Sequence, residues 1–177
     1  MHTVKMVITG AVNSGKSQFI RTISEIEVVS TERKATDEET RRLKKETTVA
    51  MDFGRITVAE DIVLHLFGTP GQKRFDFMWE ILSEGMLGLV VLVDSTRPET
   101  FRETLRIIEF FNSYRPIPFV VAANKQDMDD AWKPDEVRHA LRLPREVKVL
   151  PLIAREREQV KNVLLELLYT ILAMAED

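Results

Sequence analysis

Apolar and polar positions alternate along the chain in blocks that predict strands separated by amphipathic helices. Short apolar runs predict strands at residues 4–9, 87–93, 117–123 and 147–150. Segments 49–58 and 62–67 predict two more strands, joined by a hairpin-like turn at residues 59–61. The two central runs, which begin at residues 87 and 117, are bounded by turn residues. Such runs are typical of strands buried on both faces of a parallel sheet.

Helical spacing of apolar residues occurs between and after these runs. Helices are predicted over residues 17–23, 98–114 and 134–141, and the clearest one ends the chain. In that last segment the apolar residues spaced three and four apart are Val160, Val163, Leu164, Leu167, Leu168, Ile171 and Leu172. Its polar face mixes both signs of charge, which favours packing on a sheet over lying on a membrane surface. Alternating strands and helices predict an open, mostly parallel sheet with helices on both faces.

Length, charge and composition narrow the classes of protein that fit this pattern. The 177 residues predict one domain over 1–177. The absence of cysteine excludes disulfides, thiolate zinc sites and cysteine nucleophiles. The net charge of -3 does not mark a nucleic-acid binder, and no apolar run is as long as a membrane span. His2 stands where myristoylation needs glycine, and the last residues form no prenylation box. We therefore expect a cytoplasmic protein with no direct membrane anchor and no nucleic-acid partner.

A phosphate-binding motif follows the first predicted strand. The pattern GxxxxGK[ST] is matched by Gly10, Ala11, Val12, Asn13, Ser14, Gly15, Lys16 and Ser17. Glycines let the backbone N–H groups wrap around a phosphate, and the helix that follows points its positive end at the same anion. Lys16 adds a positive charge for the terminal phosphates, and the Ser17 hydroxyl can bind Mg²⁺. A chance glycine turn before a helix is the alternative. The motif predicts a nucleoside triphosphate without identifying its base.

A second motif follows the strand at 117–123. Asn124, Lys125 and Asp127 occur within the sequence Asn-Lys-Gln-Asp. Asp127 can accept hydrogen bonds from N1–H and the exocyclic amine of guanine, whereas N1 of adenine is an acceptor and repels a carboxylate. The Asn124 amide can reach N7 and brace the phosphate loop, while the Lys125 stem can lie along the base with its charge in solvent. Two strand spacings separate the motifs by about 10 Å, which suits a base and its phosphates. A plain turn or helix cap is the alternative.

Together these motifs resemble those of the Ras-like small GTPases, over residues 4–175. The resemblance is strongest to the prokaryotic MglA-like branch, which includes GTPases encoded beside Roadblock-domain proteins. Residues 48–53 resemble switch I and the strand after it, residues 67–72 resemble switch II, and residues 152–155 resemble the second guanine-contacting loop. The resemblance implies an α/β, three-layer P-loop NTPase fold. Its mostly parallel sheet has six strands with one antiparallel edge strand, and about five helices surround it.

The resemblance also implies roles for single residues outside the two motifs. Thr48 would bind Mg²⁺ through its hydroxyl and the γ-phosphate through its N–H, and the neighbouring Thr47 is the rival for this role. Gly71 would donate its N–H to the γ-phosphate, and Gln72 would orient the attacking water. The N–H of Ala154 would meet O6 of guanine.

The sequence departs from the family's pattern at positions that bear on the metal and on hydrolysis. Gly68 stands where the family has an aspartate that holds a water on Mg²⁺. Asp52 and Asp94 lie near the site and could substitute, although the plainer interpretation, which we prefer, is that both serve the fold. Val12 stands where Ras-type members carry glycine, which predicts slow hydrolysis. Residues 25–47 form a polar stretch. Its candidates for an internal arginine finger are Arg33, Arg41 and Arg42, although charges in such a stretch are usually only solvated.

These features lead us to expect a molecular switch that binds GTP and GDP with Mg²⁺ and hydrolyses GTP slowly. The residues expected to take part in hydrolysis are Gln72, Lys16 and Gly71. By resemblance, a Roadblock-domain protein regulates the switch and an unknown effector reads it. One alternative is a non-catalytic GTP/GDP-binding module. Another is a small ATP-dependent kinase, which leaves the Asn-Lys-Gln-Asp motif without a role.

Overall fold

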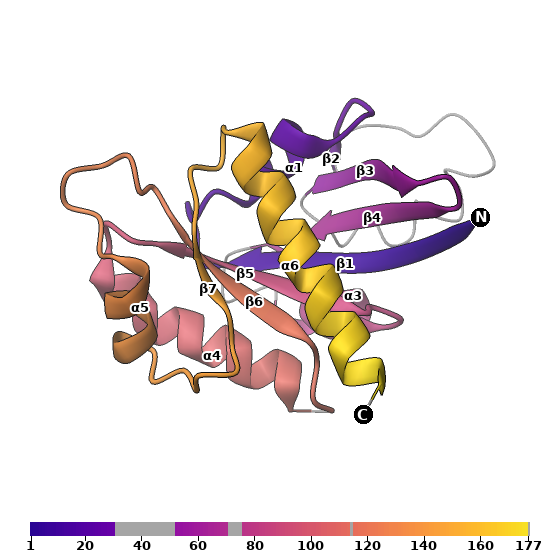
Figure 1. Cartoon of the computed structure of the whole chain (residues 1–177). Coiled ribbons are helices and arrows are strands. Elements are labelled where there is room, and N and C mark those ends of the chain that lie inside the picture. The colour runs from indigo at the N-terminus through magenta and orange to yellow at the C-terminus, as the bar shows by residue number, and fades with distance from the viewer. Residues whose placement is uncertain (31–51, 71–75, 114, 177) are drawn as a thin grey trace.

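The apolar runs of the sequence form one sheet in the computed structural model, which describes residues 1–30, 52–70, 76–113 and 115–176. The sheet has seven strands in the order β2-β3-β4-β1-β5-β6-β7 (Figure 1). Their bounds are β1 His2–Gly10, β2 Val29–Ser30, β3 Asp52–Ala59, β4 Ile62–Gly68, β5 Gly88–Asp94, β6 Phe119–Asn124 and β7 Val149–Pro151. This confirms the predicted α/β fold class and places every predicted strand.

Strand directions divide the sheet into a parallel body and an antiparallel edge. β4, β1, β5, β6 and β7 run parallel to their neighbours, whereas β3 is antiparallel to β4 and to β2. The β3–β4 register places Asp52 opposite Gly68. The strand beyond the expected six is β2. With two residues, it is too short to produce an alternating pattern, and it lies in a stretch that the sequence marks only as polar.

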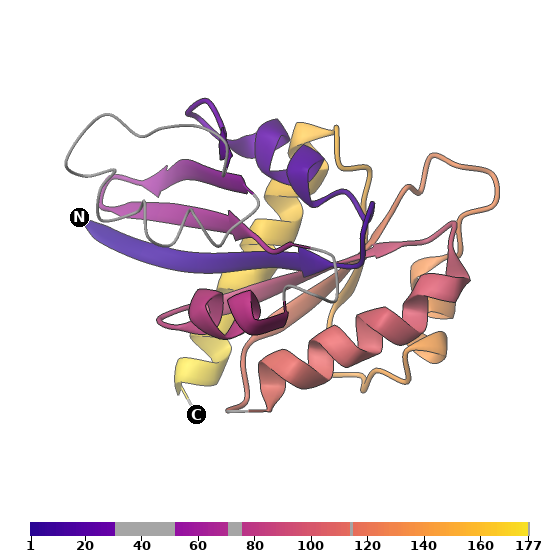
Figure 2. The same ribbon diagram turned by 180° about the vertical axis from the view of Figure 1, so that it is seen from behind.

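Helices cover both faces of the sheet. The α-helices within the described residues are α1 Lys16–Ile23, α3 Asp76–Ser83, α4 Phe101–Asn112, α5 Pro134–Ala140 and α6 Arg157–Glu176. α1 and α6 lie on one face, and α3, α4 and α5 lie on the other (Figures 1 and 2). The predicted three-layer arrangement is therefore present. α3 was not predicted as a helix; among its described residues, Trp79 and Leu82 are the buried apolar ones.

Two apolar cores follow from the alternation of side chains along the strands. Met6 and Ile8 of β1 belong to the core under α1 and α6, whereas Val7 between them belongs to the core under α3, α4 and α5. The same alternation divides β5, whose seven residues are all buried. In the second core Trp79 packs against Phe110 and Phe111, with ring centroids 5.4 and 6.0 Å away. Burial on both faces explains why the central strands are continuous apolar runs.

The parallel strands bring the two sequence motifs to the same edge of the sheet. β1 ends in the phosphate loop and β6 ends in the Asn-Lys-Gln-Asp loop, and β5 lies between them. Asp94 at the end of β5 pairs with Asn124 at the end of β6. Ligands of open α/β sheets bind at the carboxyl ends of the strands, so a ligand-binding site is expected at this edge.

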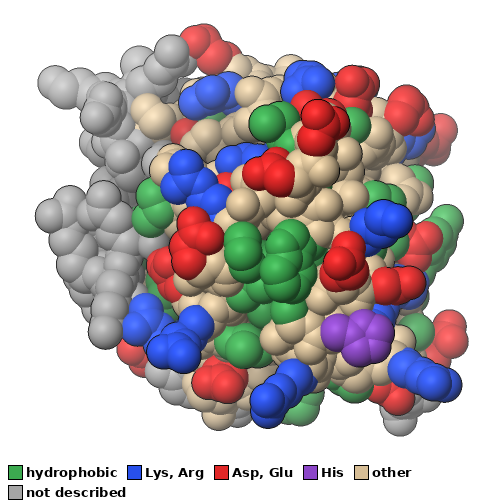
Figure 3. Space-filling model, turned by 90° about the vertical axis from the view of Figure 1, so that its left-hand side faces the viewer, with side chains coloured by type: hydrophobic (Ala, Val, Ile, Leu, Met, Phe, Trp, Pro, Cys, Tyr) green, Lys and Arg blue, Asp and Glu red, His purple; other side chains and the backbone are tan. Residues whose placement is uncertain are grey.

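Charges on the visible surface are mixed in sign. On the face shown in Figure 3, acidic and basic side chains are interspersed around small groups of apolar ones. This pattern agrees with the small net charge of the chain. Among the helices in the described part of the chain, none has the length and apolar character needed to cross a bilayer.

Candidate nucleotide-binding site

The phosphate loop connects the end of β1 to the start of α1 through unusual backbone angles. Gly10 and Gly15 have φ values of 152° and 107°, and Asn13 has a φ of 64°. A Cβ atom at Gly10 would collide with the carbonyl oxygen of Leu92, and one at Gly15 would collide with Nδ2 of Asn124. The glycines are therefore required both by conformation and by the close approach of the neighbouring strands.

Lys16 lies beneath this loop with 5% of its surface exposed. Its Nζ donates hydrogen bonds to the carbonyl oxygens of Gly10 and Ala11, at 2.7 and 2.8 Å. Burial lowers the pKa of Lys16 to about 8, and the nearby carboxylates of Glu103 and Asp52 counteract part of that shift. A buried ammonium is costly unless an anion compensates it, and a phosphate in the loop would supply that charge.

Ser17 and Asp52 form a pair of oxygen ligands beside Lys16. The Ser17 hydroxyl donates a hydrogen bond to Oδ2 of Asp52, which is only 5% exposed. Gly68 lies opposite Asp52, and a Cβ added to it would come within 3.1 Å of Cδ1 of Ile20. A carboxylate thus lies on the strand next to Gly68, directly opposite it. A hydroxyl and a carboxylate are ligands that Mg²⁺ accepts, so the residues present fit this ion.

A single amide joins the phosphate loop to the base loops. Asn124 is 3% exposed; its Nδ2 donates to the carbonyl oxygen of Ser14 at 2.9 Å, and its Oδ1 accepts from the N–H of Ala154 at 3.1 Å. The structure therefore contains the bracing bond expected from the sequence. The Ala154 N–H, expected to meet guanine O6, is used by Asn124 in this structure.

Lys125 is held by a buried carboxylate rather than by solvent. Its Nζ lies 2.7 Å from Oδ2 of Asp94, whose side chain is fully buried. Oδ1 of Asp94 accepts two further hydrogen bonds from Thr96. Burial raises the pKa of Asp94, but the hydrogen bonds from Lys125 and Thr96 outweigh it and lower the pKa below its usual value. In this structure the Lys125 charge is thus paired with Asp94, while its side chain is 34% exposed.

Asp127 already has a cationic partner. Oδ2 of Asp127 lies 3.0 Å from Nη1 of Arg155, and the two side chains are 27% and 64% exposed. A guanine edge needs both oxygens of this carboxylate, so Arg155 shares an atom with the expected ligand. Sequence reasoning missed this arginine. Its position directly after Ala154, in the second base loop, was the available signal.

Several expected residues fall outside the described part of the chain. These are Thr47, Thr48, Gly71, Gln72, Arg33, Arg41 and Arg42. Val12, in the phosphate loop, is 43% exposed. At residues 1–30, 52–70, 76–113 and 115–176, no group of three or more histidine, aspartate or glutamate side chains is arranged to hold a metal ion. Of the two expected metal ligands, Ser17 and Thr48, only Ser17 lies within the described residues.

Comparisons with known proteins support a nucleotide-binding fold. A family model described as conserved hypothetical ATP binding protein matches residues 26–174. An uncharacterised protein of Methanocaldococcus jannaschii is 32% identical over 127 residues, which cover 72% of this chain and 73% of that protein. ADP-ribosylation factor-like protein 3 of Saccharomyces cerevisiae is 26% identical over 168 residues, or 90% of this chain and 81% of that protein.

A solved structure supports the same architecture. The Arl6 BBS3 small GTPase from Trypanosoma brucei, solved with the bound nucleotide analogue GppNp, superposes with a TM-score of 0.69. The match covers 96% of this chain and 98% of that one at 18% identity. At this identity the likeness concerns the fold alone.

Proposed function

We propose that this chain, which belongs to the conserved hypothetical ATP binding protein family and has the Ras/Arf-like small GTPase fold, binds GTP and GDP as a molecular switch. The observation that carries the proposal is the Asn124 amide, which ties Ser14 to Ala154. This tie brings the Lys16 end and the Asp127 end into one site. A ligand that satisfies both ends has phosphates at one end and a base with two adjacent donors at the other.

The phosphate end would bind the anion through the loop N–H groups and the ammonium of Lys16. Ser17 and Asp52 would hold Mg²⁺, together with Thr48, and this ion would supply positive charge that neutralises the phosphates. Asp52 is within hydrogen-bond reach of the Ser17 hydroxyl, so the two oxygens are already adjacent. Gly68 has no carboxylate to offer the ion, and Asp52 would supply one instead.

The switch would hydrolyse GTP slowly. Gln72 would orient the attacking water, while Gly71 and Lys16 would stabilise the negative charge on the transferred group. An intrinsic rate on the order of 10⁻⁴ to 10⁻² s⁻¹ is expected for such sites without a partner arginine. A Roadblock-type protein would regulate the switch. Single-turnover hydrolysis by the wild type and by Gln72→Ala separates this enzyme from a module that only binds, because equal rates would favour the module.

ATP is the rival ligand, since the family description names ATP binding. The chemistry of the base loop argues against it. Adenine presents N1, an acceptor, where Asp127 presents a carboxylate, so the two groups repel each other. Sites built on paired hydrogen bonds reject a base that cannot form them by ~10⁴.

Displacement of labelled GDP by GTP, ATP and xanthosine triphosphate tests this proposal, along with identification of the nucleotide that copurifies with the chain. We expect GTP to compete at least 10³-fold better than ATP. Asp127→Asn should transfer the preference to xanthosine triphosphate, because the amide donates to the keto oxygen at position 2. Asp130→Asn, an exposed acid of the same loop, is the matched control and should change nothing. Equal displacement by ATP, or an unchanged preference in Asp127→Asn, would show that the base assignment is wrong.

A further inference from the structure

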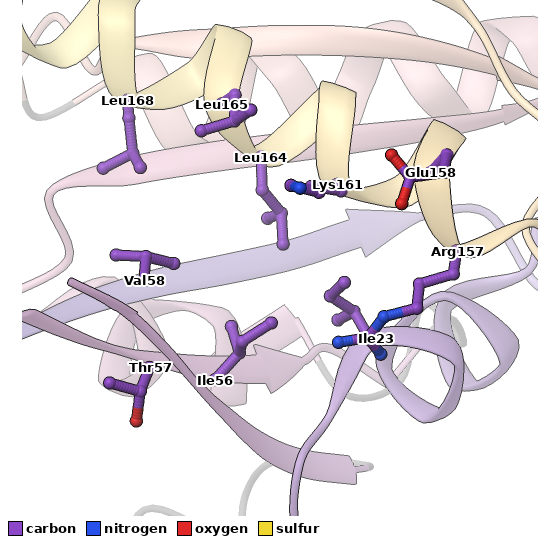
Figure 4. Close-up of a pocket in the computed structure, with 10 residues that line it drawn as sticks. All are labelled: Ile23, Ile56, Thr57, Val58, Arg157, Glu158, Lys161, Leu164, Leu165 and Leu168. Carbon is purple, nitrogen blue, oxygen red and sulfur yellow. The ribbon is translucent and has the colours of Figure 1, made fainter.

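A groove of about 310 Å³ lies between β3, the end of α1 and α6 (Figure 4). Its far wall lies away from Asp52, because Val58 is six residues along β3 from Asp52, or about 20 Å at about 3.3 Å per residue. Its near wall is closer to the phosphate loop, because Ile23 is six residues along α1 from Ser17, or about 9 Å. None of the residues that line the groove belongs to the nucleotide-binding residues proposed above.

The groove exists because α1 is too short to cover its part of the sheet. α1 has 8 residues and spans about 12 Å, whereas the 8 residues of β3 span about 26 Å. The far half of β3 contributes Ile56, Thr57 and Val58 to the groove, which α6 lines from the other side. Val58 in this half is 40% exposed, so the fold leaves an aliphatic surface open where a continuous layer would bury it.

The groove has an apolar end and a charged end. Its apolar part is purely aliphatic and consists of Ile23, Ile56, Val58, Leu164, Leu165 and Leu168. Figure 4 shows Leu165, Leu168 and Val58 at one end, and the charged side chains of α6 at the other. A wall without aromatic rings has no surface on which a flat ring would stack. It suits a flexible hydrocarbon chain.

The charged end carries a net positive charge. Arg157, Glu158 and Lys161 line it, which gives two cations against one anion. Nη1 of Arg157 donates to the carbonyl oxygen of Thr22 at 3.3 Å, so this guanidinium is tethered next to the groove. Lys161 has no ion-pair partner among the residues that the structure describes. A single negative charge entering this end would be attracted by both cations.

We infer that the groove binds a medium-chain fatty acid, with the hydrocarbon chain along the aliphatic wall and the carboxylate at Arg157 and Lys161. The volume is at the lower limit of ligand pockets, which favours one unbranched chain over a two-chain lipid. Each methylene that enters the wall should tighten binding by up to about fourfold. The inference does not depend on nucleotide binding, and each can fail while the other holds.

Methyl NMR on the whole chain tests the inference directly, with octanoate, decanoate, dodecanoate and dodecanol as probes. We expect shifts confined to the methyl groups of the groove, affinity that rises with chain length, and weaker binding of dodecanol. Val58→Glu should weaken dodecanoate binding at least tenfold, because it places a carboxylate in the wall. Ile81→Glu on α3, where the wild-type side chain is also 40% exposed, should leave binding unchanged.

A second pair of variants tests the position of the head group. Lys161→Glu should weaken dodecanoate binding severalfold while leaving dodecanol binding as it was. Arg145→Glu, at an exposed site that is not among the residues lining the groove, should affect neither. Three results would overturn the inference. They are methyl shifts spread over the surface, equal binding by Val58→Glu and the wild type, and equal losses for dodecanoate and dodecanol in Lys161→Glu.

Discussion

The two ends of the nucleotide site are built in different ways. At the phosphate end Lys16 and Asp52 are each 5% exposed, and Lys16 bonds to backbone carbonyls that cannot move independently of the loop. At the base end Asp127 is held by Arg155, a side chain that is 64% exposed. The phosphate end is therefore fixed by the fold, while the acid that we propose selects the base is held by a contact that solvent and salt can reach.

This difference has a consequence for binding energy. Interactions between buried charges are screened little by salt, whereas an exposed ion pair contributes about 0–1 kcal/mol and weakens as salt rises. Substitutions at the phosphate end should therefore have large effects that salt changes little. Substitutions around Asp127 that spare the carboxylate itself should have small effects that depend on salt.

Removing the buried carboxylate of Asp52 from β3, and then placing one at Gly68 on β4, should produce the largest change in Mg²⁺ affinity. Asp52→Asn removes the charge next to Ser17, and we expect Mg²⁺ affinity in the presence of GDP to fall by at least about 10-fold, because even the loss of a group that only orients a metal ligand costs about 10- to 100-fold. Gly68→Asp in the same chain returns a carboxylate to the opposite residue of β4, and part of the Mg²⁺ affinity should return. Titration of Mg²⁺ against GDP release rates measures both.

The control for these two substitutions is Asp94, a nearby carboxylate that is paired with Lys125 of the base loop. Asp94→Asn should leave the Mg²⁺ dependence unchanged and loosen Lys125, whose Nζ it holds at 2.7 Å. If Asp52→Asn kept the wild-type Mg²⁺ dependence, Asp52 would be a residue of the fold only, and the sequence's plainer interpretation would stand.

The pair formed by Asp52 and Gly68 also shows what could be predicted from the sequence. A hairpin centred on residue 60 puts residues 52 and 68 opposite each other, so this juxtaposition could be predicted from the expected turn. The phosphate loop could be predicted because its motif is one continuous stretch of sequence and the local backbone conformation requires its glycines. The loop and the Asp52–Gly68 pair thus both follow from short-range sequence pattern and strand register.

Other features depended on how distant loops converge. Lys125 meets Asp94 across 31 residues, and Arg155 meets Asp127 from a different loop. Neither pair has a spacing that a motif could encode, because each is set by the packing of β5, β6 and β7. The two-residue strand β2 also has no periodic signal in the sequence, because pairing with β3 determines its position.

Raising the pH should weaken the phosphate end selectively. The pKa of Lys16 in the free protein is about 8, lowered by burial, and bound phosphate favours the charged form. Binding above pH 8 therefore takes up a proton, and GDP affinity should fall up to tenfold per pH unit, to about a tenth at pH 9. Lys16→Met should bind weakly with no such slope. A wild-type affinity that stays constant from pH 7 to pH 9.5 would contradict the assignment.

Stability of the free protein should change in the opposite direction over the same range. The unfolded chain keeps the Lys16 proton up to its ordinary pKa of 10.5, whereas the folded chain releases it near 8. The unfolded state thus binds more protons in this window, so the free energy of unfolding rises with pH, by at most about 3 kcal/mol attributable to this lysine. Urea unfolding of the wild type and Lys16→Met, compared at pH 7.5 and 9.5, isolates the contribution.

Removing the exposed partner of Asp127 should have the smallest effect, and its sign is informative. Arg155→Gln frees the oxygen that Nη1 occupies at 3.0 Å, so we expect GDP to bind more tightly, by less than about fivefold. The ratio of wild-type to variant Kd should approach one as salt rises, because salt screens the pair. Arg145→Gln controls for the loss of one positive charge. A variant that binds GDP more weakly than the wild type would show that Arg155 positions the carboxylate for the base rather than competing with it.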